Sequence, residues 1–170
     1  IYFSITGGDG RVQWLLGDFK IASGYGLNLW RSSSGFKGYT SSNSLSRMGT
    51  GLRPSRSFAS NWRLRGAAMA VEGQIYQTNV ALFDESGAGN KGSISAGCLS
   101  TDFYLFGFTG GFSAAGDRQS GNLAVSIYGR RKLSGGIVFG EVAKGFSGRL
   151  GLITGAQIVE KEFRYLICGR

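Results

Sequence analysis

Apolar and polar positions alternate with a period of two along much of this chain. From Tyr76 to Leu82 the even positions are Tyr, Thr, Val and Leu, while Gln77 and Asn79 stand between them. The same alternation recurs at residues 62–70, 103–113, 123–128, 137–140 and 163–167. Successive side chains of a strand point to opposite faces, so each stretch predicts a β-strand with one apolar face.

Turn-forming residues separate these stretches. Gly and Asp gather at residues 7–10, 85–92 and 116–122, and shorter Gly- and Ser-containing connections occur at 132–136 and 145–148. Such residues favour the backbone conformations of tight turns. Residues 32–60 are polar and hold the only Pro, Pro54, which predicts one long loop. The pattern predicts a single domain over residues 1–170, with about nine strands.

The composition excludes several classes of protein. Thirty of the 170 residues are Gly and one is Pro, and 13% are aromatic. Disordered chains have few aromatic residues, and collagen needs abundant Pro. No apolar run is long enough for a transmembrane helix, and Gly interrupts every candidate helical window. An all-β antiparallel fold remains, as a barrel or as a soluble β-sandwich.

The residues on the second face of the strands bear on that choice. They are mostly Gly, Ser, Thr, Asn and Gln with isolated Arg, whereas a soluble sandwich usually exposes charge there. Small neutral residues opposite an aromatic face are typical of transmembrane β-barrels, whose outer side touches lipid. This pattern leaves both architectures open.

Several short motifs occur in the same order as in a known family. They are Gly17–Ile21, Gly24–Leu27, Gly51–Pro54, Arg65–Ala68, Phe139–Ala143 and Phe163–Tyr165. The ordered set resembles large outer-membrane β-barrel proteins of the Bacteroidota, which often carry N-terminal helix-hairpin-helix repeats. The resemblance covers most of residues 14–170 and matches an interior stretch of such a barrel.

The resemblance implies a porin-like wall, or a sector of a larger barrel, in the outer membrane of a Gram-negative bacterium. It implies a structural, transport or assembly-scaffold role, with the lipid bilayer and other chains of an outer-membrane assembly as partners. A sector alone would leave two unpaired sheet edges, which lipid does not tolerate, so more chain or a partner must complete it. Two other functions stay open: a soluble binding or adhesin-like module, and a basic nucleic-acid-binding domain.

Candidate catalytic chemistry is sparse. The chain has no His, which excludes Ser-His-Asp and Cys-His arrangements. Asp84 and Glu85 are adjacent and would point to opposite faces, while Lys161 and Arg164 crowd the nearby acids of residues 160–162. We therefore predict no enzyme, cofactor or metal site. Cys98 and Cys168 could form a disulfide in an oxidising compartment, but two free thiols are the favoured interpretation.

Basic and aromatic residues supply the candidate site. Formal net charge is +9, and we predict a lumen or rim cluster of Arg63, Arg65, Arg130 and Arg131. Arg63 and Arg65 alternate with an apolar face, so they should point inward together if the wall faces lipid. A nucleic-acid surface ranks behind this interpretation. Aromatic side chains at Trp14, Trp30 and Trp62, together with Tyr25, Tyr76 and Tyr104, are expected at the membrane interface, or in the core of a sandwich.

Overall fold

The computed structural model describes residues 4–28, 48–55, 64–84, 96–117, 121, 123–145, 148–160 and 163–169. These residues form one antiparallel sheet, and they include no helix that could cross a membrane. The strands are β1 (Ser4–Gly8), β2 (Val12–Ala22), β3 (Gly51–Pro54), β4 (Leu64–Glu72), β5 (Tyr76–Asp84), β6 (Ala96–Leu105), β7 (Phe108–Asp117), β8 (Leu123–Leu133), β9 (Gly136–Lys144), β10 (Leu150–Glu160) and β11 (Phe163–Gly169).

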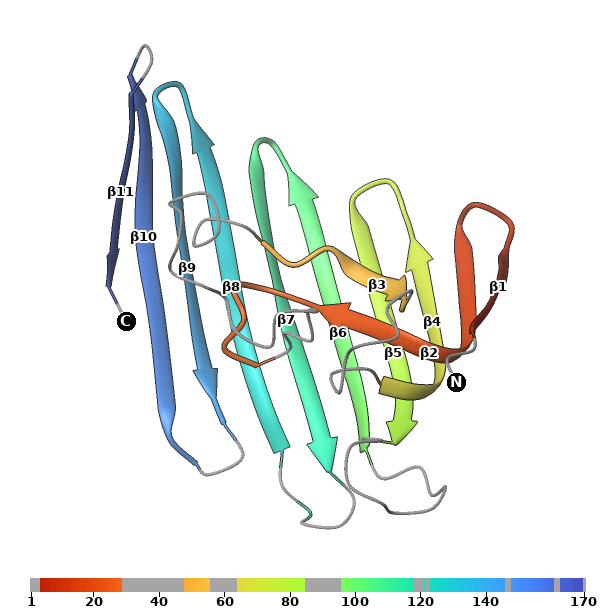
Figure 1. The fold of residues 1–170 in the computed structure, drawn as a ribbon. Helices are drawn as coiled ribbons and strands as arrows, with labels where there is room; N and C mark the ends of the chain where they lie inside the picture. Colours follow the sequence, from red (N-terminus) through yellow and green to blue (C-terminus); the bar gives the residue numbers. More distant parts are fainter. Residues whose placement is uncertain are drawn as a thin grey trace.

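The strands follow one another as a meander (Figure 1). The order in the sheet is β1-β2-β4-β5-β6-β7-β8-β9-β10-β11, and β3 pairs with β2 beside this path. The all-β antiparallel expectation is therefore confirmed. Among the described residues the sheet stays open, with β1 and β11 as its two edges, and it does not close into a barrel.

Two boundaries differ from those that the sequence pattern suggests. Residues 103–113 are not one strand, because Phe106 and Gly107 form a turn between β6 and β7. Both turn residues have positive φ, at 44° and 77°. A period of two continues through a two-residue turn, so alternation alone could not reveal it. The predicted loop at 32–60 is also interrupted, by β3; its segments 32–47 and 56–60 lie outside the described residues.

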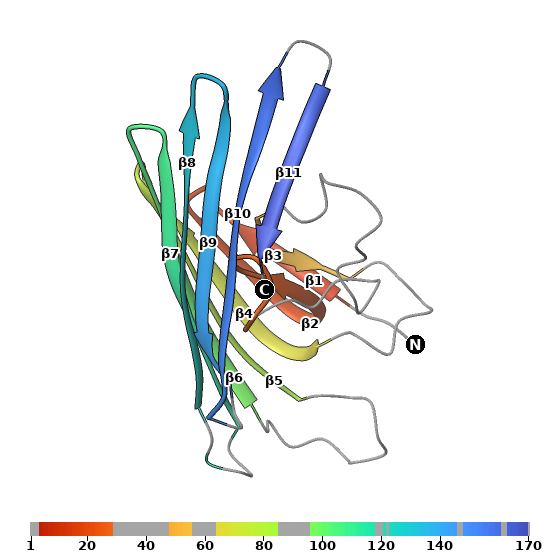
Figure 2. The same cartoon turned by 90° about the vertical axis from the view of Figure 1, so that its left-hand side faces the viewer.

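The sheet curves strongly, and its two faces differ. Figure 2 shows β1, β2 and β3 on the concave side of the wall formed by β5–β9. We call this concave side the inner face and the convex side the outer face. Leu15, Phe19 and Ile21 of β2 and Leu52 of β3 are buried against the inner-face side chains of β4–β7.

Inner-face side chains beneath β2 and β3 are small. One cross-strand row begins at Leu15 of β2 and continues with the small residues Ala68, Ala81, Cys98, Ala115 and Ala124. The next row carries Ala70, Asn79, Ser100, Ser113, Ser126 and Ala143. A row of short side chains leaves room for a second layer of backbone at close packing distance. The inner face is thus covered by a second layer formed by the same chain.

The two ends of the strands carry connections of different length. At one end the strands turn within residues 9–11, 73–75, 106–107 and 134–135, and two residues outside the described part of the chain separate β10 from β11. At the other end the connections span residues 23–50, 55–63, 85–95, 118–122 and 145–149. We call these the short-turn end and the long-loop end; the short-turn end is uppermost in Figure 1.

Enlarging an inner-face residue should cost more stability than enlarging an outer-face one. Ala81 is 1% exposed on the inner face, and Ala114 is half-buried on the outer face. We expect Ala81→Leu to destabilise the fold by about 1–3 kcal/mol because the added methyl groups overpack the core. Ala114→Leu should change the free energy of unfolding by less than about 0.5 kcal/mol. Urea unfolding of both variants measures the difference, and equal losses would contradict this two-faced packing.

Candidate functional site

The outer face presents large apolar side chains. One row aligns Val71, Thr78, Thr101, Phe112, Ile127, Val142 and Leu152 from β4 to β10. Ile127 is 72% exposed and Val142 51% exposed. Among the described residues, every exposed large hydrophobic side chain belongs to this face except Ile75 and Phe106, in turns, and Tyr104, on the inner face. Apolar patches of this extent mark an interaction surface.

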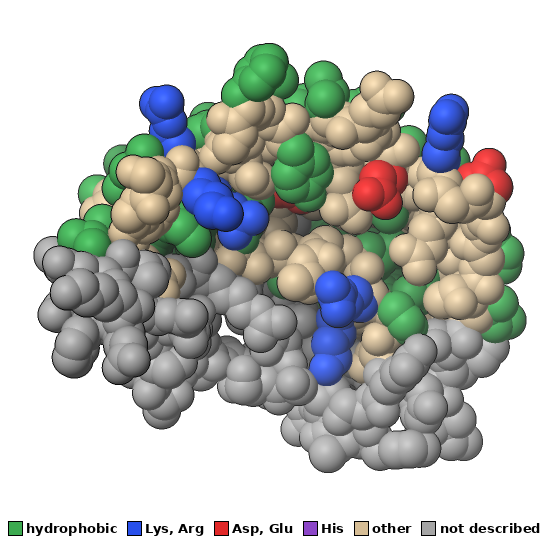
Figure 3. All heavy atoms as spheres, turned by 90° about the horizontal axis from the view of Figure 1, so that it is seen from above, with side chains coloured by type: hydrophobic (Ala, Val, Ile, Leu, Met, Phe, Trp, Pro, Cys, Tyr) green, Lys and Arg blue, Asp and Glu red, His purple; other side chains and the backbone are tan. Residues whose placement is uncertain are grey.

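Charge on the outer face is confined to the strand ends. Across β4–β9 the described charged side chains of this face are Arg65, Asp84 and Lys144 near the long-loop end and Arg131 near the short-turn end. Figure 3 looks onto the short-turn end and shows Lys and Arg side chains standing apart, with hydrophobic side chains along the rim between them. The middle of the outer face is therefore an uncharged apolar band.

The inner face holds a short segment of chain that follows β2. Glu141 of β9 is 1% exposed, and its Oε2 accepts hydrogen bonds from the backbone N–H of Tyr25, at 2.6 Å, and of Leu27, at 3.3 Å. Hydrogen bonds to an ionised carboxylate are stronger than those between neutral groups. We call residues 23–28 the inner segment. Glu141 fixes it to the wall from 116 residues away in the sequence.

Two further contacts hold the ends of the inner segment. The hydroxyls of Ser23 and Tyr128 are hydrogen-bonded, and the Tyr128 hydroxyl also donates to Oδ1 of Asp102, at 2.7 Å. At the other end, Nδ2 of Asn28 donates to Oγ of Ser113, at 2.9 Å. These partners are buried, so their hydrogen bonds replace those they would make with water.

Gly24 allows this close approach. Its φ is +62°, and a Cβ at this position would come within 2.7 Å of the Tyr128 ring and 2.9 Å of Oε1 of Glu141. Residues with a side chain rarely adopt this backbone conformation, and here one would also collide with the wall. The glycine is therefore required by both backbone and packing.

Tyr25 packs its ring into the wall. It stacks on Phe139 with ring centroids 4.7 Å apart and is 1% exposed, and Met48 and Tyr128 complete the cluster. Burial, which disfavours the charged phenolate, raises the pKa of Tyr25 to about 12. Tyr25 is thus an inner-face core residue, which agrees with the core alternative for this aromatic and not with a position at a membrane interface.

The predicted basic residues do not form one cluster. Arg65 lies on the outer face near the long-loop end, where its Nε and Nη2 reach the carboxylate of Asp18, at 2.8 and 3.1 Å. Arg130 and Arg131 lie on β8 near the short-turn end and alternate between the inner and outer faces. Arg63 lies outside the described residues. The inward orientation expected for Arg65 is wrong, because its strand buries Leu64 and Ala68 instead.

The predicted aromatic residues and cysteines lie in different environments. Trp14 is 42% exposed on the outer face, aligned with Met69, and Tyr76 is also exposed there. Trp30 and Trp62 lie outside the described residues. Cys98 is a free thiol buried on the inner face, and the side chain of Cys168 is not among those described.

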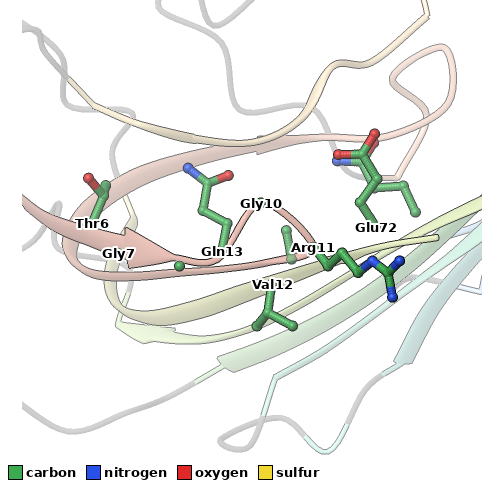
Figure 4. A pocket seen from close by; sticks show the side chains of 10 residues that line it. Thr6, Gly7, Gly10, Arg11, Val12, Gln13 and Glu72 are labelled. Atoms are coloured by element: carbon green, nitrogen blue, oxygen red, sulfur yellow. The ribbon is translucent and has the colours of Figure 1, made fainter.

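Two hollows open at the short-turn end. The first, of about 370 Å³, is lined by residues of β1, β2, β4 and β5. Figure 4 shows Thr6, Gln13 and Glu72 pointing to the same side of the ribbon, while Arg11 extends away from them. The second hollow, of about 490 Å³, lies beside the turn at Phe106 and Gly107 and contains Arg130 and Lys132. Within the described part of the chain, no group of three acidic or Cys side chains could hold a metal ion.

Sequence reasoning missed the residues that hold the inner segment. Glu141 is the only acid in β9 and Asp102 the only acid in β6. A single carboxylate within a strand of small and apolar residues is costly to bury without a partner. Its presence in the sequence was therefore the one indication that a buried polar contact exists there. Nothing in the sequence identified the partners Tyr25 and Ser23.

Comparisons with known proteins identify no relative of this chain. No protein-family model matches the chain, and neither curated proteins nor solved structures give a match.

Removing the Glu141 carboxylate should release the inner segment. Glu141→Ala leaves two backbone N–H groups without their acceptor, which costs about 1.5–3 kcal/mol. We expect amide hydrogen exchange at Tyr25 and Leu27 to accelerate about 10- to 150-fold. Glu72→Ala, at an exposed inner-face carboxylate, should leave both amides unchanged. Equal protection in wild type and Glu141→Ala would contradict this role.

Alkaline pH should weaken the fold through Tyr25. Its pKa is about 12 in the folded protein against an ordinary value of 10, so ionisation favours the unfolded state. The contribution is complete below pH 10 and declines as pH rises towards 12. In urea unfolding between pH 9 and pH 11.5, Tyr25→Phe should therefore lose less stability than wild type. Parallel declines would show that Tyr25 titrates normally.

Proposed function

We propose that this chain is a sector of the wall of an outer-membrane β-barrel, with a structural, transport or assembly-scaffold role and no enzymatic one. The observation that carries the proposal is the outer face: an uncharged apolar band on one side of the sheet, opposite small and polar side chains on the other. In lipid an apolar outer side and a polar inner side are the stable arrangement for a β wall.

Strand length supports the same proposal. β2 and β4–β10 are consecutive in the sheet and have 9–11 residues each. About 9–11 residues in a tilted strand span the hydrocarbon core of a bilayer. Short turns at one end and longer connections at the other are also typical of outer-membrane barrels, which place their short turns in the periplasm.

The open edges define what the proposal requires. An unpaired strand edge within hydrocarbon leaves backbone N–H and C=O groups without partners, at several kcal/mol each. β1 and β11 would therefore pair with further strands, supplied by more chain or by another chain of an outer-membrane assembly. The inner segment occupies the lumen side of this wall, which favours a structural or scaffold role over a wide pore.

A soluble β-sandwich module is the second candidate. The packing of Leu15, Phe19 and Leu52 against β4–β7 is a two-layer core of the kind that sandwiches use. This candidate leaves the apolar outer face of β4–β10 to water or to a protein partner, and it predicts folding without detergent.

A cation in the middle of the outer face separates the two candidates. In a membrane wall, Ile127→Arg should destabilise the fold in lipid by about 2–4 kcal/mol. Ser134→Arg, in an exposed turn, should cost less than about 0.5 kcal/mol. Unfolding of both variants in vesicles measures the difference.

Detergent dependence provides an independent test. A barrel wall should require detergent and migrate as a folded form in unheated gel samples. A chain that stays monodisperse in plain buffer, with Ile127→Arg as stable as wild type, would overturn the membrane proposal in favour of the sandwich.

A further inference from the structure

The second hollow at the short-turn end, which we call the rim notch, lies at a step in the rim. Its lining residues are Tyr104–Thr109, Arg130, Lys132 and Ile137. The step arises because β8 and β9 continue past the turn at Phe106 and Gly107 as far as the pair Leu133 and Gly136. The backbone N–H of Lys132 donates to the carbonyl of Gly107, at 3.0 Å, and fixes the turn against β8.

The charge in the rim notch is entirely positive. Arg130 and Lys132 come from the same face of β8, and no carboxylate lines the notch. Within the described part of the chain, neither cation forms an ion pair. Arg130 also interacts electrostatically with Asp102, which is buried and accepts a hydrogen bond from Tyr128. The two cations are therefore available to an external anion.

The other side of the rim notch is apolar and continues onto the outer face. Phe108 is 47% exposed, and a Cβ on Gly110 would come within 2.5 Å of its ring, so the ring lies directly over that glycine. Phe108 pairs with Leu105 on β6 and with Arg131 on β8. Phe106, 97% exposed, projects from the turn itself.

We propose that the rim notch binds the phosphate group of an anionic amphiphile. Arg130 and Lys132 would contact the phosphate oxygens, and Tyr104 and Thr109 line the same notch. The hydrocarbon would pass over Phe108 and Leu105 towards the outer face. A lipid headgroup and a soluble phosphorylated amphiphile share this chemistry. The inference depends on the notch and holds whether or not the chain lies in a membrane.

Lipid selectivity measured by native mass spectrometry tests the proposal. The full chain, released from neutral detergent, is titrated with phosphatidylglycerol or with phosphatidylcholine of the same acyl chains. We expect phosphatidylglycerol to bind at least about tenfold more tightly, because near-surface cations attract anionic headgroups. The double variant Arg130→Gln, Lys132→Gln should abolish this preference. Lys144→Gln, at an exposed cation near the long-loop end, should preserve it.

Competition identifies the part of the ligand that is recognised. Dodecyl phosphate should displace phosphatidylglycerol, whereas inorganic phosphate at the same concentration should not. Displacement by inorganic phosphate to the same extent would overturn the amphiphile and leave a simple anion site. An unchanged preference in the double variant would overturn the rim notch as the site.

A chain that folds without detergent is tested in plain buffer with dodecyl phosphate alone. Binding that depends on Arg130 and Lys132 would support the rim notch even though the membrane proposal had failed. Absence of binding there would overturn the notch independently.

Discussion

Close packing of the chain against its own curved sheet is the constraint on which the rest of this structure depends. The inner face can be covered because its central side chains are Ala, Ser, Asn and Cys, which leave room for β2, β3 and the inner segment. Larger residues there would push this second layer away and expose the wall. The curvature, the buried polar contacts and the uncovered outer face all follow from which side of the sheet receives this layer.

The polar contacts on the inner face show how the second layer is held in one place. Apolar packing alone would not fix the position of a short segment on a surface of small side chains. Glu141 instead accepts from two particular backbone N–H groups, and Asn28 reaches a particular serine, Ser113. A buried carboxylate tolerates few alternative arrangements because each lost hydrogen bond costs free energy. Specific placement of the inner segment is the consequence.

The motifs that carried the family resemblance acquire a shared physical role. Gly24–Leu27 and Phe139–Ala143 are distant in sequence, yet Glu141 of the second binds the backbone of the first. Asp18 and Arg65, from two further motifs, form a bidentate ion pair. Residues that meet in this way constrain one another. This is a structural reason for the motifs to occur together in one chain, whatever the function of the wall.

The sequence by itself determined the fold class, because strands with two chemically different faces must alternate with a period of two. It located most strands, and it named Trp14 as a candidate interfacial aromatic, a residue that the structure places on the exposed outer face. It could not show that residues 103–113 contain a turn, since a tight hairpin preserves the alternation. Nor could it orient Arg65 or find the partner of Glu141. Those depend on which face the chain covers and on contacts between residues over 100 positions apart, which only the tertiary structure decides.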